Sequence, residues 1–195
     1  IANNGVIFIE SARKATHFIQ LANKSNTPLL FIHNTTGFMV GKKHEQSGMI
    51  NAGSQLVHSV AGSTVPHISL QIGNSYGAGN YAMCGRSFNP RFLFSYPNSK
   101  SGVMGADQLA GVMEIVKRKS AESLNKVIDE KLLLEEKKNL AEQAEKKASV
   151  WHTTSEVWDD GVIDPRDTRK YLSMALSVVY NNEIKGTDSF GVFRM

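Results

Sequence analysis

The five residues Gly73-Asn74-Ser75-Tyr76-Gly77 match the G-x-S-x-G pattern, in which a serine on a sharp strand-to-helix turn attacks a carbonyl carbon. They follow a predicted strand and precede a predicted short helix, which is the context that this chemistry requires. A hydrolase of this kind also needs an acidic residue and then a histidine further along the chain. His152 is the only histidine after Ser75, and it follows a long charged segment. A serine hydrolase that uses Ser75 is therefore one open alternative.

The next residues, Tyr76-Gly77-Ala78-Gly79, favour a chemistry that uses the main chain. Glycine and alanine leave the backbone bare, and the first N–H groups of a helix have no partner within it and lie at its positive end. Two such amides can stabilise an oxygen that becomes negatively charged during a reaction. Phosphate binding uses the same physics, but neither G-x-x-x-x-G-K-[ST] nor G-x-G-x-x-G occurs in the chain. A plain close-packed turn is the alternative.

The other side chains with catalytic potential show no spacing that indicates a site. The histidines form no HExxH or similar metal-binding pair, and we interpret each as a surface or internally hydrogen-bonded residue. His44, near the first glycine-bearing loop, is the exception to watch. Cys84 is the only cysteine, which excludes an internal disulfide and a multi-cysteine zinc site. We expect a buried structural thiol there and no metal in this domain.

The elements that must position these residues alternate between strand and helix. Apolar runs or alternating patterns predict strands at 5–9, 29–32, 68–72 and 92–94. Helical periodicity predicts helices at 11–22, 46–61, 80–85 and 167–180. This order is typical of an α/β fold with right-handed crossovers. The continuous apolar run 29–32 predicts a strand that is covered on both faces.

Several details of the helices can also be predicted. Ser11 and Asp167 are the expected N-caps of the first and last helices. The inner face of the first helix should carry Ala15, Phe18, Ile19 and Ala22. The segment 107–148 is helical throughout by its pattern of leucine, alanine and charge, and we expect a break near 132–136.

Composition limits the class of protein. Hydrophobic residues make up 41% of the 195 residues and charged residues 21%, which is typical of one globular domain. The net charge is +4, but acids and bases alternate along 117–147, whereas a nucleic-acid binder usually concentrates its bases. No apolar run approaches the roughly 20 residues of a membrane helix. We therefore expect neither a nucleic-acid nor a membrane partner. The chain starts without methionine, and we expect it to be a piece of a longer protein.

Taken in order, the motifs resemble one family over almost the whole chain. The loop 34–41 (NTTGFMVG) and the stretch 73–86 (GNSYGAGNYAMCGR) are similar to the two glycine-bearing loops of carboxyltransferase (β) subunits of biotin-dependent acyl-CoA carboxylases, in their C-terminal domain. The segments 90–93, 103–105, 157–165 and 191–195 follow in the expected order. The GAGNY form and the FRM ending most resemble β subunits that act on 3-methylcrotonyl-CoA, and geranyl-CoA carboxylases are the nearest confusable relatives.

The resemblance implies an α/β, crotonase-like (ClpP/crotonase) fold, a spiral superhelix of ββα units. It implies that 1–195 is a single C-terminal carboxyltransferase domain, with 107–148 as a helical segment within it. The N-terminal domain of such subunits, which holds the acyl-CoA, is absent from this sequence. In the family the active site forms between the N domain of one subunit and the C domain of another. A homo-oligomer, expected to be a hexamer, is implied.

The resemblance also implies a mechanism. Biotin, carried on a partner carrier domain of the biotin carboxylase/carrier subunit, delivers its carboxyl group, and loss of CO₂ leaves negative charge on the ureido oxygen. The backbone amides of Ala78 and Gly79 would form the oxyanion hole for that charge. Gly77, Tyr76 and Tyr81, together with Gly37 and Phe38 in the facing loop, would line the biotin pocket. The carboxyl group would pass to an acyl-CoA, expected to be 3-methylcrotonyl-CoA in leucine degradation.

Two further expectations complete this interpretation. The compartment would be the mitochondrial matrix in a eukaryote and the cytoplasm in a bacterium. The isolated chain should be inactive and should expose an apolar face where the absent domain or a partner subunit docks. Besides the hydrolase, a non-catalytic oligomerisation domain of a degenerate paralogue remains an alternative.

Overall fold

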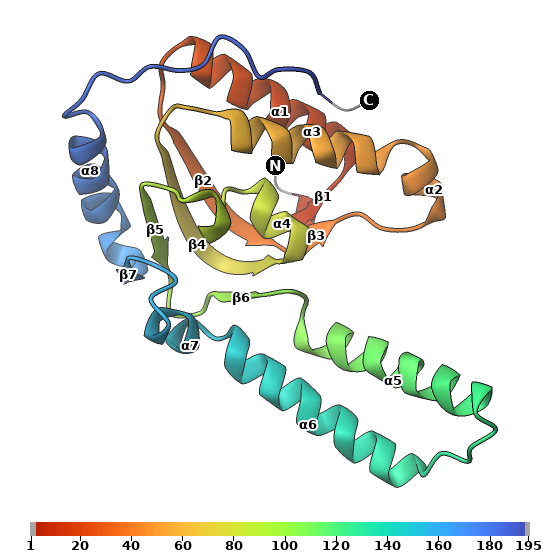
Figure 1. Ribbon diagram of the computed structural model, residues 1–195. Coiled ribbons are helices and arrows are strands. Elements are labelled where there is room, and N and C mark those ends of the chain that lie inside the picture. The colour runs from red at the N-terminus through yellow and green to blue at the C-terminus, as the bar shows by residue number, and fades with distance from the viewer. Residues whose placement is uncertain (1–2, 194–195) are drawn as a thin grey trace.

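A computed structural model describes residues 3–193, and its centre is a parallel sheet of five strands (Figure 1). The strand order is β2-β4-β5-β7, and β6 pairs with the far end of β4, beyond β5. The strands of this sheet are β2 (Leu29–Thr35), β4 (His67–Tyr76), β5 (Phe92–Ser95), β6 (Lys100–Gly102) and β7 (Gly161–Val162). Two short strands, β1 (Val6–Ile7) and β3 (Gly37–Phe38), form a separate parallel pair. The α/β fold with a parallel sheet is confirmed.

Two helices, α1 (Ile9–Lys24) and α3 (Met49–Gly62), pack side by side over one face of the sheet (Figure 1). Their buried residues meet Leu29 and Phe31 of β2 in the larger core cluster. A short helix, α2 (Lys42–Gln46), precedes α3. On the other face, α8 (Thr168–Val179) buries Ala175 and Val179 against β4 and β5. These two layers cover β4 over its first five residues, all of which are buried.

The expectation that β2 is covered on both faces is wrong for the described residues. Its burial alternates along the strand, so that Leu30 and Ile32 are exposed while Leu29 and Phe31 are buried. Leu30 and Ile32 lie on the same face as their β4 partners Ile68 and Leu70, which α8 covers. Because β2 is an edge strand, α8 does not reach it. An apolar surface therefore remains open at this edge.

One cap and one inner-face assignment were also wrong. Helix α1 begins at Ile9, so Ser11 lies within its first turn and is buried, and Phe18 is 63% exposed. Asp167 occupies the N-cap position of α8, as predicted, but its side chain makes no capping hydrogen bond. Instead, the carboxylate of Asp164 accepts a hydrogen bond from the Arg166 amide in the 3₁₀ turn η3 (Pro165–Asp167) before it.

The predicted helical segment is a hairpin of two helices that projects from the body (Figure 1). These are α5 (Ala106–Ser123) and α6 (Glu130–Ala148), followed by α7 (Val150–Ser155). The break lies at 124–129, earlier than expected, because Asn125 takes a left-handed φ of 51° and Asp129 caps α6 by accepting bonds from the amides of Lys131 and Leu132. The capping residue Asp129 marks the start of α6 in the sequence, and the periodicity of apolar residues did not indicate it.

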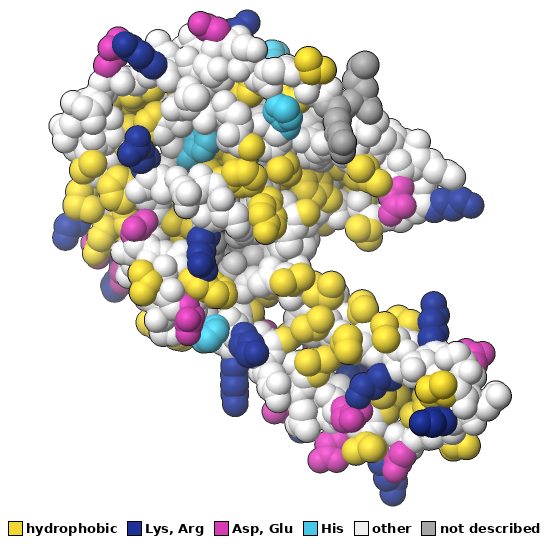
Figure 2. Space-filling model, in the orientation of Figure 1, with side chains coloured by type: hydrophobic (Ala, Val, Ile, Leu, Met, Phe, Trp, Pro, Cys, Tyr) yellow, Lys and Arg dark blue, Asp and Glu magenta, His cyan; other side chains and the backbone are white. Residues whose placement is uncertain are grey.

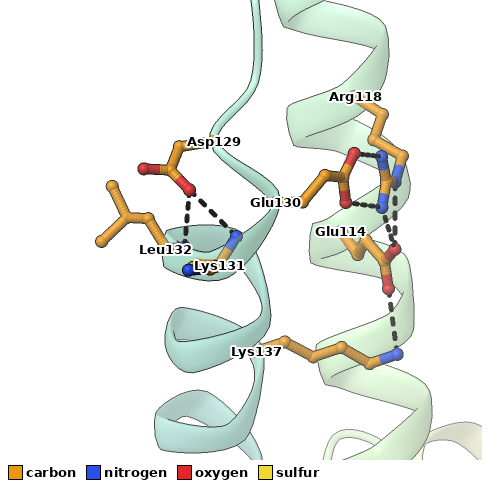
Figure 3. Close-up of polar contacts among 7 residues, drawn as sticks. All are labelled: Glu114, Arg118, Asp129, Glu130, Lys131, Leu132 and Lys137. Atoms are coloured by element: carbon orange, nitrogen blue, oxygen red, sulfur yellow. Dashed lines mark hydrogen bonds and ion pairs between the residues drawn. The ribbon is translucent and has the colours of Figure 1, made fainter.

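Charged pairs join the two arms of the hairpin (Figure 3). The guanidinium of Arg118 contacts carboxylate oxygens of Glu114 at 2.9 Å and Glu130 at 2.7 Å, and Lys137 lies 2.9 Å from Glu114. A Lys117–Glu136 pair adds to this set. These side chains are largely solvent-exposed, so their contribution to stability is small, although they favour one pairing of the two helices.

The chain after α8 runs back across α1 and α3 (Figure 1). The carbonyl of Phe190 lies 2.6 Å from Nε2 of His58 on α3, and the amide of Thr187 donates to Oδ1 of the buried Asn23 on α1. The expected ending of the family pattern falls partly on 194–195, which lie outside the described residues. Within 3–193, none of the helices is both long enough and apolar enough to cross a membrane.

Candidate functional site

The short helix α4 (Gly77–Ala82) follows β4 without an intervening loop, and it begins earlier than the predicted 80–85. Gly77 makes the turn possible. Its φ is +51°, and a Cβ there would lie 2.7 Å from the carbonyl oxygen of Val103. The amides of Ala78 and Gly79 belong to the first turn, whose N–H groups have no acceptor within the helix. No described side chain caps this end.

A cleft of about 790 Å³ opens at this end of α4. Ala78 is exposed at its wall, and Gly77, Asn80 and Tyr81 line it beside Ala78. The opposite wall includes Val103 and Trp158, with the guanidinium of Arg86 4.7 Å from the Trp158 ring centre. The structure therefore brings Ala78, Gly77 and Tyr81 of the predicted set to one cleft.

Gly79 and Gly37 meet behind this turn. A Cβ on Gly79 would lie 3.0 Å from the Cα of Gly37 and 3.2 Å from the side chain of Thr35, so the two backbones approach closely. The amide of Gly37 donates to Oγ1 of Thr35 at 3.3 Å. Gly79 is buried, whereas Ala78 is exposed. The predicted facing loop therefore lies against α4, and the amide of Gly37 in that loop already donates a long hydrogen bond to Thr35.

Phe38 and Tyr76 take other places. The Phe38 ring packs on α3, where a Cβ on Gly53 would lie 3.2 Å from it, and it joins the core rather than the lining of the cleft. Tyr76 is buried and borders a second cleft of about 790 Å³, where α5 and α6 join the body. Burial, and then the charge of Glu145, raise the pKa of the Tyr76 hydroxyl, and Lys100 partly opposes them.

Hydrophobic side chains line both sides of the open notch between the body and the hairpin (Figure 2). The second cleft lies at its closed end, between Thr36 and Tyr76 of the body and Gly105, Asp107 and Glu145 of the hairpin. An ion pair between Lys100 and Glu145 joins β6 to α6 there.

A buried polar network lies under α4 and was not predicted from the sequence. Nδ1 of His33, on β2, lies 2.9 Å from Oγ of Ser75 at the end of β4, and Nδ2 of Asn80, on α4, donates to the same oxygen at 2.8 Å. His33 and Ser75 are both 0% exposed. The only available signal was a histidine 42 residues before the serine, a separation that carries no meaning until the two strands pair.

This network overturns the hydrolase alternative. Ser75 has a histidine beside it, but no substrate carbonyl can reach a fully buried hydroxyl. Nε2 of His33 has no hydrogen-bond partner among the described residues, so no acid orients the ring as a triad requires. His152, the histidine that the pattern had offered, lies on α7 against the ring of Trp158.

Cys84 is the buried structural thiol that we expected. It follows α4, is 0% exposed, and its Sγ lies 3.1 Å from Nδ1 of His67. Burial raises the pKa of the Cys84 thiol to about 12, and a hydrogen bond with Ser69 opposes this only in part. Burial likewise lowers the pKa of His67 to about 4. A neutral thiol beside a neutral imidazole is not a nucleophilic pair.

His44, which the sequence singled out because it lies near the first glycine-bearing loop, has its ring centre 6.1 Å from that of Phe8.

Comparisons with known proteins agree on one family. The family model described as "Carboxyl transferase domain" matches residues 1–193. A Mycobacterium tuberculosis protein, "Probable biotin-dependent acyl-coenzyme A carboxylase beta2 subunit", is 54% identical over 98% of this chain and 36% of its own length. "Methylcrotonoyl-CoA carboxylase beta chain, mitochondrial" of Dictyostelium discoideum is 45% identical over 100% of this chain and 33% of its own.

A solved structure gives the same result for the fold. The β subunit of geranyl-CoA carboxylase from P. aeruginosa matches with a TM-score of 0.85 and 44% identity, over 97% of this chain and 36% of that one. The crotonase-like fold is thereby confirmed. The chain spans about a third of the length of the relatives it matches.

Proposed function

The chain belongs to the carboxyl transferase domain family, and from this premise we propose that it is the half of a carboxyltransferase active site that receives carboxybiotin. The observation that carries the proposal is the first turn of α4. It presents main-chain N–H groups at a cleft, at Ala78 above all, and none of the side chains within 3–193 caps that end of the helix.

The chemistry of these donors suits a ureido oxygen. When bound, carboxybiotin supplies the carboxyl group to be transferred. The amides of Ala78 and Gly79 would stabilise the negative charge on the oxygen that they face, and they need no reorganisation because the helix already orients them. Gly77 keeps the turn compact, and Tyr81 would shape the wall of the cleft. None of the titratable side chains of this domain would donate or accept a proton in this step.

The acyl acceptor would be a CoA thioester held by the remainder of the subunit. We extend the proposal to 3-methylcrotonyl-CoA because relatives named for that substrate are 43–45% identical across this chain. The residues that would select the acyl group lie outside this sequence, and the similarity to a geranyl-CoA carboxylase makes a longer acyl chain the alternative.

Partners follow from the same proposal. The biotin would arrive on a carrier domain of a biotin carboxylase/carrier subunit, and the apolar notch would be filled by a second subunit in a homo-oligomer, expected to be a hexamer (Figure 2). Relatives from eukaryotes are named mitochondrial, so a eukaryotic source would place the protein in that organelle.

The test removes one amide and leaves the helix in place. Ala78→Pro in the full-length subunit deletes the N–H at the second position of α4, where proline is tolerated. We expect carboxyl transfer between a carboxylated acyl-CoA and free biotin to fall by about 10²–10³-fold, the usual effect of losing an oxyanion donor.

The matched control is Arg169→Pro, at the second position of α8, where no described cleft lies. It should leave the transfer rate near that of the unmodified enzyme. A folded Ala78→Pro variant that retains full transfer activity would support the alternative, a non-catalytic domain of a degenerate paralogue.

A further inference from the structure

The buried network under α4 connects three elements through one oxygen atom. Oγ of Ser75 contacts His33 of β2 and Asn80 of α4, while Ser75 itself is the penultimate residue of β4. The register between β2 and β4 shifts just here, between His33 and Thr35. The three side chains therefore bridge the point where the regular pairing of the strands is interrupted.

Asn80 is fixed on its other side as well. Its Oδ1 lies so close to Gly85 that a Cβ there would be 1.9 Å from it, and the Gly85 amide donates to the Asn80 carbonyl at 2.8 Å. Asn80 is one residue beyond Gly79 and two beyond Ala78. A rotation of α4 about its axis would therefore break the hydrogen bond between Asn80 and Ser75.

We propose that His33, Ser75 and Asn80 are positioning residues that hold the amides of Ala78 and Gly79 in the orientation that carboxyl transfer requires. The inference rests on the proposed function, since it assigns the network to the same half-site. None of the three acts on substrate directly: His33 and Ser75 are fully buried, and Asn80 directs its side-chain amide inward to Ser75.

Stability alone does not account for this arrangement. Nε2 of His33 makes no hydrogen bond of normal geometry with the described residues, although the Met83 main chain lies near enough to influence the ring, and a buried nitrogen without a full hydrogen bond costs free energy that an apolar residue of similar size would not. Buried polar groups that are hydrogen-bonded to one another make the surrounding structure more rigid and favour one geometry. The network therefore gives α4 a defined orientation at some expense of stability, as expected of a group that serves a reaction.

The experiment uses Ser75→Ala in the full-length subunit. Loss of the shared oxygen should lower kcat for transfer to free biotin by about tenfold, less than the loss of a donor, because the amides are displaced rather than removed. KM for the acyl-CoA should be unchanged, because that substrate is assigned to the other domain. Ser59→Ala is the matched control, since Ser59 is equally buried and its hydroxyl bonds only Gln55 of its own helix.

A second pair of variants keeps the test decisive if Ser75→Ala folds poorly. His33→Gln retains an amide that can bond Ser75 and should keep most of kcat, whereas His33→Leu should lose as much as Ser75→Ala. Equal kcat values for His33→Gln and His33→Leu, or for Ser75→Ala and Ser59→Ala, would overturn the inference. If Ala78→Pro lowers transfer while Ser75→Ala does not, only the positioning role fails. If neither does, the proposed function fails with it.

Discussion

At the scale of single residues, two buried histidines make the stability of the folded protein depend on pH. Burial lowers the pKa of His33 to about 4, offset only in part by the Met83 main chain, and lowers that of His67 to about 4 as well. Both are therefore neutral in the folded protein, whereas in the unfolded chain they take up protons near their ordinary pKa of 6.5. Each contributes full stability above 6.5, and that contribution is lost as the pH falls toward 4.

We predict that the free energy of unfolding decreases by up to about 1.4 kcal/mol per pH unit for each of these histidines between about pH 6 and about pH 4.5. Urea unfolding of the protein across this range measures the slope. His33→Gln should remove about half of the slope, whereas His17→Gln, at an exposed position of α1, should leave it unchanged. A slope that is the same in all three proteins would contradict the assignment.

Cys84 and Ser75 show why a reactive residue type does not make a site. Each has a histidine within hydrogen-bonding distance, and each is completely buried. The proposed donors belong to the main chain, and Ala78, between two glycines, is exposed at the cleft. A scan of side chains for nucleophiles would have selected the wrong residues.

At the scale of elements, the hairpin of α5 and α6 is held to itself by few buried contacts. Among its described residues, Ala110 and Leu133 are buried in the contact between the helices, and most other apolar side chains are exposed. The ion pairs of Figure 3 lie at the surface, where salt screens them. The hairpin should therefore open more readily than the sheet.

Two neighbouring leucines test this. Leu133 is 5% exposed and Leu132 is 55% exposed. Leu133→Ala should destabilise the hairpin by about 2–4 kcal/mol, and hydrogen exchange should accelerate in α5 and α6 but not in β4. Leu132→Ala should change exchange in neither. Faster exchange throughout β4 in Leu133→Ala would show instead that hairpin and body unfold together.

At the scale of the whole molecule, the apolar edge of the sheet agrees with the expectation of an exposed docking face. A groove along β2 and α1 is lined by Phe18, Leu21, Leu30 and Ile32, each at least 44% exposed. The chain spans about a third of the relatives it matches, and docking of the remainder of the subunit or of a partner at this face stays a prediction. It is separate from the notch of Figure 2, where hydrophobic side chains line a second open surface.

Adjacent residues on β2 distinguish a docking face from a core. In the isolated chain, Leu30→Ser should reduce self-association, measured by sedimentation, and leave Tm almost unchanged because Leu30 is 44% exposed. Phe31→Ser, at 8% exposure, should lower the free energy of unfolding by about 3–5 kcal/mol. A large loss of Tm in Leu30→Ser would mean that the face is already buried in the isolated chain.

The sequence by itself determined the order of strands and helices, the α/β class and the family. Those depend on local patterns: the period of apolar residues, glycines at turns, and motifs long enough to be specific. It also indicated a bare stretch between a strand and a helix, visible as letters, to which the resemblance assigns Ala78 and Gly79 as oxyanion donors; that role stays a prediction. Errors occurred where local signals compete, as at the hairpin break, which the Asp129 cap sets, and at Ser11, which lies inside α1.

Only the tertiary structure decided which residues meet. Ser75 and His33 are brought together by parallel pairing of β2 and β4, and Gly37 meets Gly79 across a loop, over separations on which periodicity is silent. It also decided which faces are covered, since burial of Leu30 depends on how far α8 extends over the sheet and not on the apolar run itself. Contacts distant in sequence depend on packing of the whole chain, and for that reason no local pattern specifies them.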